Sequence, residues 1–156
     1  MRLRSLLSLL AVTLVGSWLF TRCKPAVHSL ADLPEEQLRF GSGGGFAGTS
    51  TEHILLANGQ YFKKPQQSQQ YGYIATINRA TARAYHKRAQ ALQLRTADFD
   101  HPGNMYYYLQ LGEDKANRVT WGDINHPVDE RIQALYKELL GTVSKVQREL
   151  PGSAKQ

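Results

Sequence analysis

The chain has 156 residues, with 19 Lys and Arg against 13 Asp and Glu, a net charge of +6 and one cysteine. Apolar residues make up 42% and charged residues 21%, which is the composition of a folded chain and excludes full disorder. The length fits one domain and is too short for most large catalytic barrels, and a single cysteine excludes an internal disulfide framework.

The first 24 residues have the pattern of an export segment. Two arginines in the first four residues precede an uncharged, leucine-rich run over residues 5–20, which is slightly short for a membrane span. We predict a signal peptide or an N-terminal membrane anchor over 1–24, with membrane contact through residues 3–21. Cleavage, lipidation at Cys23 and retention stay open, whereas a buried core helix would need a polar face that this run lacks. The expected location is the bacterial cell envelope or periplasm, exported or membrane-associated.

This segment also holds much of the net charge. Four of the nineteen basic residues and no acidic residue lie in 1–24, which leaves fifteen basic against thirteen acidic residues and a net charge of +2. Downstream, Arg79, Arg83, Lys87 and Arg88 come closest to a basic block, and their helical spacing is typical of a solvated helix face. We therefore expect no nucleic-acid partner.

The first half of the remaining chain is typical of β-structure. Residues 25–36 contain two prolines and no hydrophobic periodicity, so we interpret them as a linker in front of a single domain over 37–148. Strands are expected over 38–40, 49–56 and 60–64, with a further short strand possible over 71–75. Asn58-Gly59 predicts a type I′ hairpin turn, in which both central residues have positive φ.

The second half combines two helices with an aromatic β-hairpin. Asn78 is a good N-cap for a helix from Arg79 to about Gln93. Its modest apolar side is expected to consist of Ala80, Ala84, Tyr85, Ala91 and Leu92. Strands follow over 105–111 and 118–121, and a second helix begins near Pro127, before a flexible tail over 149–156. Its apolar residues recur at helical spacing and form one stripe: Ile132, Leu135, Tyr136, Leu139, Leu140, Val143 and Val146.

Together these elements predict an α+β fold with about five strands and two helices. An antiparallel sheet with both helices on one face is the simplest packing. By strand alternation, Met105, Tyr107, Leu109 and Leu111 share one face and are expected in the core. Tyr106 and Tyr108 share the other face, where they either line a recognition surface or cover the sheet under a helix.

A glycine-rich segment over 41–48 is the first candidate site. It is followed by a strand and lacks the Lys-Ser/Thr of a phosphate-binding loop, so a nucleotide cradle is not expected. It is either a wide bend with Phe46 packed into the core, or an exposed loop that carries Phe46 to a partner. The predicted partner-binding residues are Gly43, Gly44, Gly45, Phe46 and Gly48.

The segment Arg39-Phe40-Gly41-Ser42-Gly43-Gly44-Gly45-Phe46-Ala47-Gly48 resembles the opening of the emfourin-like protealysin inhibitors. The later order of a helix, an aromatic hairpin ending in Trp121-Gly122-Asp123 and a closing apolar helix is also similar. The resemblance implies a small α+β protein that inhibits thermolysin-type metalloproteases. The chain also resembles small uncharacterised bacterial envelope proteins, for which no activity is implied.

Two polar turns form the second candidate site. An antiparallel hairpin of strands 105–111 and 118–121 would bring the turn before it and the turn after it to one edge. Imidazole and carboxylate groups there suit Zn or Mn, and the candidate metal ligands are Asp100, His101, Asp123 and His126. The plainer interpretation, which we favour, is that the prolines fix these turns and that the Asp, Asn and His side chains satisfy backbone groups within them.

We expect a protein-binding module that is not an enzyme and uses no cofactor, with a protease or another protein as its partner. The alternative is a small metal- or ligand-binding envelope enzyme that uses the two Asp/His/Asn turns. A structural lipoprotein acylated at Cys23 is a third possibility.

Overall fold

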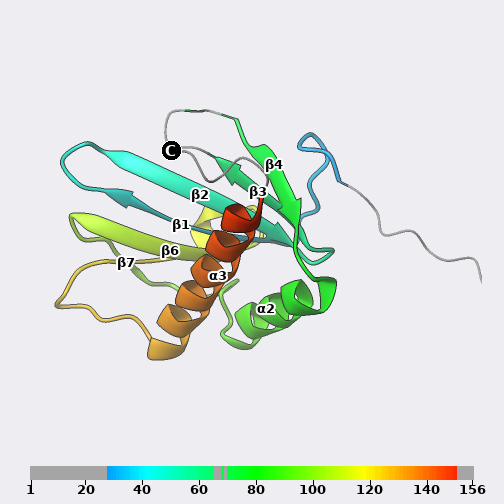
Figure 1. Cartoon of the computed structure of the whole chain (residues 1–156). Coiled ribbons are helices and arrows are strands. Elements are labelled where there is room, and N and C mark those ends of the chain that lie inside the picture. The colour runs from blue at the N-terminus through cyan, green and yellow to red at the C-terminus, as the bar shows by residue number, and fades with distance from the viewer. Residues whose placement is uncertain (1–27, 65–67, 69, 151–156) are drawn as a thin grey trace, which may run out of the picture.

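The computed structural model describes residues 28–64, 68 and 70–150 (Figure 1). The predicted export segment, the first three linker residues and the last six residues of the predicted tail lie outside the described residues. Within the described part of the chain, no helix is both long and apolar enough to cross a membrane.

The fold is α+β and is built on one sheet. Its strands are β1 (Gln37–Gly44), β2 (Thr49–Leu56), β3 (Gln60–Lys64), β4 (Gly72–Thr76), β5 (Asp100–His101), β6 (Met105–Leu111) and β7 (Arg118–Trp121). They lie in the order β4-β3-β2-β1-β6-β7-β5, and all neighbours are antiparallel except β5 and β7. The described sheet therefore has seven strands rather than about five: the possible strand over 71–75 is present as β4, and β5 falls in a segment predicted as a turn.

The turn between β2 and β3 is where predicted, but its type is different. Gly59 has a φ of 96° and donates its backbone N–H to the carbonyl of Leu56 at 2.9 Å. Asn58 does not have a positive φ, so the turn is not type I′. A tight turn over residues 56–59 that ends on a left-handed glycine is the usual form of a three-residue hairpin loop, and it produces the same hairpin.

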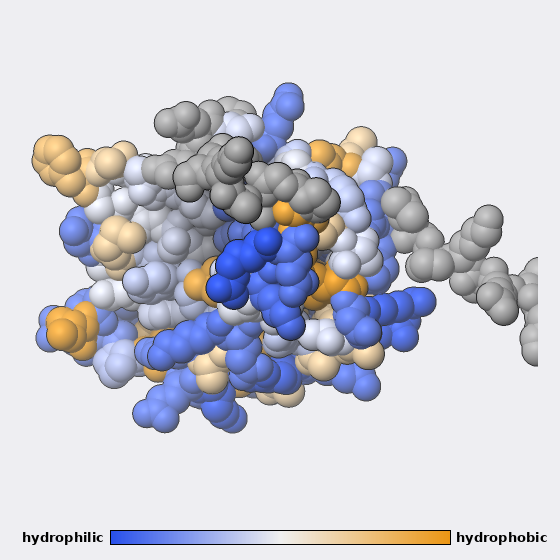
Figure 2. All heavy atoms as spheres, in the orientation of Figure 1, coloured by the Kyte–Doolittle hydropathy of each residue, from blue (hydrophilic) through white to orange (hydrophobic). Residues whose placement is uncertain are grey.

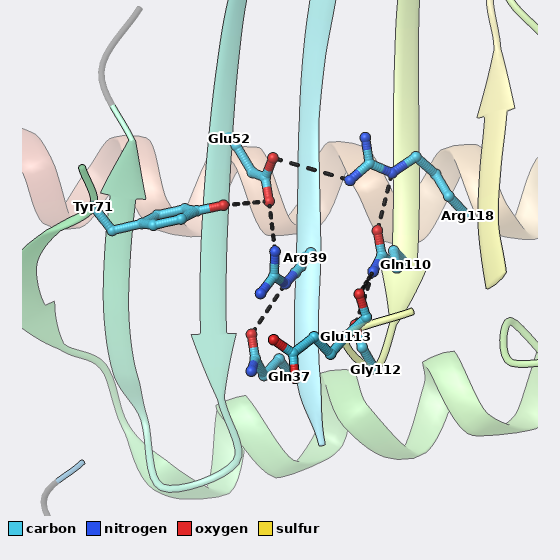
Figure 3. Close-up of polar contacts among 8 residues, drawn as sticks. All are labelled: Gln37, Arg39, Glu52, Tyr71, Gln110, Gly112, Glu113 and Arg118. Atoms are coloured by element: carbon cyan, nitrogen blue, oxygen red, sulfur yellow. Dashed lines mark hydrogen bonds and ion pairs between the residues drawn. The ribbon is translucent and has the colours of Figure 1, made fainter. Parts of the chain in front are cut away.

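Helices α2 (Arg79–Ala91) and α3 (Glu130–Glu149) cover one face of the sheet, as predicted (Figures 1 and 3). The Asn78 side chain accepts from two backbone N–H groups and caps α2, and Asp129 caps α3. The stripe predicted for α3 faces the core: Ile132, Leu135, Tyr136, Leu139 and Val143 are buried, and Leu140 and Val146 pack against them.

The core face predicted for α2 was wrong in part. Its buried apolar residues are Ala82, Tyr85 and Ala89, while Ala80, Ala84 and Ala91 are exposed. Alanine occurs on every side of this helix, so the apolar pattern alone does not decide which side faces the sheet. The larger Tyr85 fixes the orientation, and its hydroxyl lies 2.7 Å from Thr142 on α3.

Strand alternation places the core between the sheet and the two helices. Leu109 and Leu111 of β6 are fully buried there, with Val119 and Trp121 of β7. The prediction that Met105 and Tyr107 also lie in the core was wrong: they share this face but lie at the start of β6, near the end of the sheet, and are exposed. Tyr106, Tyr108 and Gln110 lie on the opposite face, as predicted from alternation. A smaller apolar cluster on that face consists of Ile54, Leu56 and Phe62, with Leu33 of the predicted linker packed against it.

The sheet has two ends that differ in character. We call one the glycine end: it holds the β1–β2 turn, the start of β6 and the loop from β7 to α3. Gly45 donates to the carbonyl of Asn104 at 2.7 Å there. We call the other the amino end: it holds the β2–β3 turn, His28 and the start of α2. The eight residues of β1 separate the two ends by about 25 Å, at about 3.3 Å per residue.

Candidate functional site

Half of the glycine-rich segment is strand rather than loop. Residues 41–44 belong to β1 and pair with β2 and β6, so the exposed turn is only Gly45-Phe46-Ala47-Gly48. Of the predicted partner-binding residues, Gly43 is buried in β1 and Gly44 is half-buried at its end. Phe46 is 110% exposed and does not pack into the core, which leaves the exposed-loop interpretation of this segment.

Four exposed hydrophobic side chains lie at the glycine end. Phe46 is joined by Ile124, which is 91% exposed on the β7–α3 loop, and by Met105 and Tyr107 at the start of β6. Figure 2 shows hydrophobic side chains projecting on the side where Figure 1 places the β1–β2 turn and the β7–α3 loop. Large apolar groups gathered at one end of a small domain are typical of an interaction surface.

An aromatic groove opens beside these side chains. It has a volume of about 520 Å³ and lies between the end of β7, the β7–α3 loop and the first turns of α3. Trp121 and Tyr136 meet edge to face at 5.2 Å between ring centroids, and Tyr107 contacts both rings. Lys137 and Gln133 of α3 add polar groups to the lining. The groove is therefore lined by both aromatic and polar side chains.

The two polar turns meet at this end, as the hairpin argument predicts. The backbone N–H of Asp123 donates to the carbonyl of His101 at 3.1 Å. The imidazole rings of His101 and His126 are stacked, with centroids 4.2 Å apart and planes inclined by 6°. His126 Nδ1 lies 2.7 Å from a carboxylate oxygen of Asp123. A backbone N–H of Asn125 and the His126 ring hold the pKa of Asp123 below its usual value.

Asp100 does not join this group. It pairs with Thr120 across the β5–β7 ladder, whereas His101 pairs with Trp121. Paired residues point to the same face of a sheet, so Asp100 lies on the face away from the stacked histidines. Among the described residues, no group of three or more His, Cys, Asp or Glu side chains is arranged to hold a metal ion.

A charged cluster on the face opposite the helices was not anticipated from the sequence (Figure 3). The Glu52 carboxylate accepts from Tyr71 at 2.6 Å and from Arg39 at 3.2 Å, and its second oxygen lies 4.0 Å from Arg118. Arg118 also donates to Gln110 and lies 4.0 Å above the Tyr108 ring. The cluster connects strands β1, β2, β6 and β7 to the segment before β4, so it stabilises the sheet as a unit.

The electrostatics of Glu52 follow from these contacts. Burial opposes its ionisation, but the hydroxyls of Tyr71 and Tyr108 and the charges of Arg118 and Arg39 outweigh burial and lower its pKa. The carboxylate is therefore charged at neutral pH. Arg39, Glu52 and Arg118 all lie in predicted strands, but only the register of four strands brings them together, which is why the sequence gives no signal for the cluster.

Tyr106 and Tyr108 have a role that neither sequence-based alternative described. They lie over glycines of β1 instead of under a helix. A Cβ on Gly41 would come within 2.6 Å of the Tyr108 hydroxyl oxygen, and one on Gly43 within 2.4 Å of the Tyr106 oxygen. The two glycines thus leave room for aromatic rings that cover the strand, a recognised way of stabilising glycine in a sheet.

Comparisons with known proteins leave the family of the chain open. No protein-family model matches it, and no curated protein matches its sequence. The assignment of function therefore depends on the chain's own residues.

Proposed function

We propose that this chain is an exported or membrane-anchored bacterial protein that binds another protein through the glycine end of its sheet. The observation that carries the proposal is that four exposed apolar side chains, Phe46, Met105, Tyr107 and Ile124, lie at this end of the sheet, where Tyr107 and Ile124 also line the aromatic groove. Binding surfaces draw most of their affinity from a few large side chains that enter pockets. Phe46 and Ile124 are projecting side chains of this kind, and the groove is a matching pocket for an apolar side chain of the partner.

The binding is steric and needs no chemistry from the chain. The turn at residues 45–48 sits on a strand that is paired on both sides, and Gly45 is held by the Asn104 carbonyl. A rigid base reduces the conformational entropy lost on binding. The resemblance of residues 39–48 to the emfourin-like inhibitors makes a thermolysin-type metalloprotease the first partner to examine.

The test is direct. The full chain, purified in mild detergent, is titrated against several thermolysin-type metalloproteases, and both inhibition and complex formation by size-exclusion chromatography are measured. The proposal expects a stable complex in which the turn at 45–48 remains uncleaved. Cleavage of the turn, or no complex with any of these enzymes, would contradict the inhibitor form of the proposal.

A further inference from the structure

The described chain begins at a fixed point on the amino end. The backbone N–H of His28 donates to Oε1 of Gln60 at 2.8 Å, and its carbonyl accepts from Nε2 of the same side chain at 3.1 Å. Gln60 is 5% exposed at the start of β3. His28 cannot move away from the sheet without breaking both hydrogen bonds, so the chain is anchored to the amino end of the sheet at this residue.

Few residues separate this point from the predicted export segment. Four residue steps lead from Lys24 to His28, and they span at most about 14 Å even when fully extended. Where the segment is retained, or Cys23 carries a lipid, the amino end is therefore held close to the bilayer. Electrostatic attraction acts over about 8 Å at physiological ionic strength, so charges on this end come within reach of lipid headgroups.

A basic stripe lies beside His28. Arg79, Arg83 and Lys87 are exposed along one side of α2, and His28, Arg79 and Arg83 line one surface hollow. No hydrogen bond or ion pair to another described residue is made by these three side chains. The helix itself gains little from them, because α2 has no acidic residue in its first turn and the helix dipole disfavours a cation at Arg79.

The charged residues next to the stripe make contacts with residues outside it. Arg88, the fourth basic residue of α2, makes a two-pronged contact with Glu138 of α3. Glu36 lines the same hollows as Arg79, Arg83 and Lys87, but its carboxylate accepts from Gln90 and lies 3.9 Å from Arg95. The three cations of the stripe therefore outnumber the one acid beside them, and none of them forms an ion pair with it.

We propose that Arg79, Arg83 and Lys87 dock on the headgroups of an anionic phospholipid bilayer. Juxtamembrane basic residues are attracted to such surfaces, and each adds to the binding. The docking would turn the amino end toward the membrane and the glycine end, about 25 Å away, toward the partner. This inference rests on the membrane attachment in the proposed function.

The experiment uses the full chain reconstituted into vesicles of phosphatidylcholine alone or mixed with phosphatidylglycerol. A photoreactive phenylalanine analogue replaces Ala84, which is exposed next to the stripe, or Ser50, which is exposed at the glycine end. Crosslinking to lipid is measured after vesicle flotation. The expected result is roughly tenfold or more crosslinking from position 84 than from position 50 in anionic vesicles, with loss of the difference at high salt.

Two triple variants that each remove three positive charges distinguish an effect of the stripe from an effect of net charge. Arg79→Gln/Arg83→Gln/Lys87→Gln should lose the crosslink at position 84, whereas Lys115→Gln/Lys145→Gln/Arg148→Gln should keep it. If the chain floats with vesicles but both triple variants behave alike, the docking is overturned and the attachment stands. If the unmodified chain does not float, membrane attachment itself fails, and the docking proposal fails with it.

Discussion

The ring of Tyr108 lies across Gly41 so closely that a methyl group on Gly41 would come within 2.6 Å of the tyrosine oxygen. The same methyl group would come within 2.1 Å of the backbone oxygen of Thr51, which cannot be relieved by a side-chain rotation. Gly41 is therefore fixed by packing on two sides.

Replacing Gly41 by alanine should destabilise the fold by about 2 kcal/mol or more, because overpacking forces the sheet or the tyrosine to shift. Gly141→Ala is the matched control: it lies in α3 with open space around a new Cβ, and it should stabilise the protein by about 1 kcal/mol. Chemical denaturation of both variants measures the difference. Equal midpoints for the two variants would contradict the packing described for β1.

Glu52→Gln should lower the free energy of unfolding by about 2 kcal/mol at neutral pH, because it removes the charged acceptor of a largely buried cluster. Glu138→Gln removes an acid from an exposed ion pair with Arg88 and should have little effect. Urea titrations of both variants test this. A large effect of Glu138→Gln together with a small effect of Glu52→Gln would show that the cluster does not hold the sheet.

The contribution of Glu52 to the free energy of unfolding should also depend on pH. Its pKa is lowered in the folded state, so its stabilising effect is present above the unfolded pKa, whose ordinary value is 4.5. The effect is lost as the pH falls through the folded pKa. The stability difference between the native chain and Glu52→Gln should therefore shrink below about pH 4.5, and a constant difference down to strongly acidic pH would contradict this assignment.

His53 should make the fold sensitive to milder acid. Burial and the nearby charge of Lys63 lower its pKa from 6.5 to about 4, and its ring is stacked between Phe40 and Tyr61. Below pH 6.5 the unfolded chain binds a proton that the folded chain does not, so stability falls progressively toward pH 4, by about 3 kcal/mol in full. His53→Phe keeps a ring in the stack and should flatten this part of the profile.

His86 should also make the fold less stable as the pH falls. Burial lowers its pKa, its Nε2 lies 3.0 Å from the carbonyl of Leu55, and its Nδ1 is buried and makes no hydrogen bond with any described residue. Protonation would add a buried donor at Nδ1 with nothing to accept it. The profile of His53→Phe should therefore retain a smaller acid-dependent loss, and a fully flat profile would show that His86 does not contribute.

Chelation provides a test of the metal alternative. Because Asp100 lies on the far face from His101, Asp123 and His126, we expect EDTA to leave the thermal midpoint unchanged. Elemental analysis of the same sample checks the stoichiometry. A stoichiometric metal, or a midpoint lowered by the chelator, would favour the metal-binding alternative over the turn-stabilising role of these residues.

Local patterns in the sequence predicted much of the fold. The α3 stripe, the Asn78 cap and the alternation of β6 depend on neighbouring residues, so they can be recognised without knowing the tertiary structure. The orientation of α2 could not be obtained in this way, because alanines on several sides give no contrast. The turn between β2 and β3 was placed correctly but given the wrong type, because Asn-Gly is compatible with more than one hairpin loop.

The candidate site was likewise predictable only where it depends on local sequence. That the turns around His101 and His126 meet follows from simple hairpin geometry, but the position of Asp100 depends on the short parallel pairing of β5 with β7. β1 continues through Gly43 because the rings of Tyr106 and Tyr108 cover its glycines, and these tyrosines lie more than sixty residues further along the chain. The Glu52 cluster needs the register of four strands. Features of this kind depend on contacts between distant segments and have no local signature.

The most direct test of the account is the affinity of the full chain for a thermolysin-type metalloprotease, compared between two variants that each remove one exposed apolar side chain. Phe46→Ser alters the glycine end, and Leu30→Ser alters the segment that follows His28 at the amino end. We predict that the native chain and Leu30→Ser bind equally, and that Phe46→Ser binds roughly tenfold or more weakly at unchanged thermal stability. No binding by the native chain, or equal affinities for the two variants, would contradict docking through the glycine end.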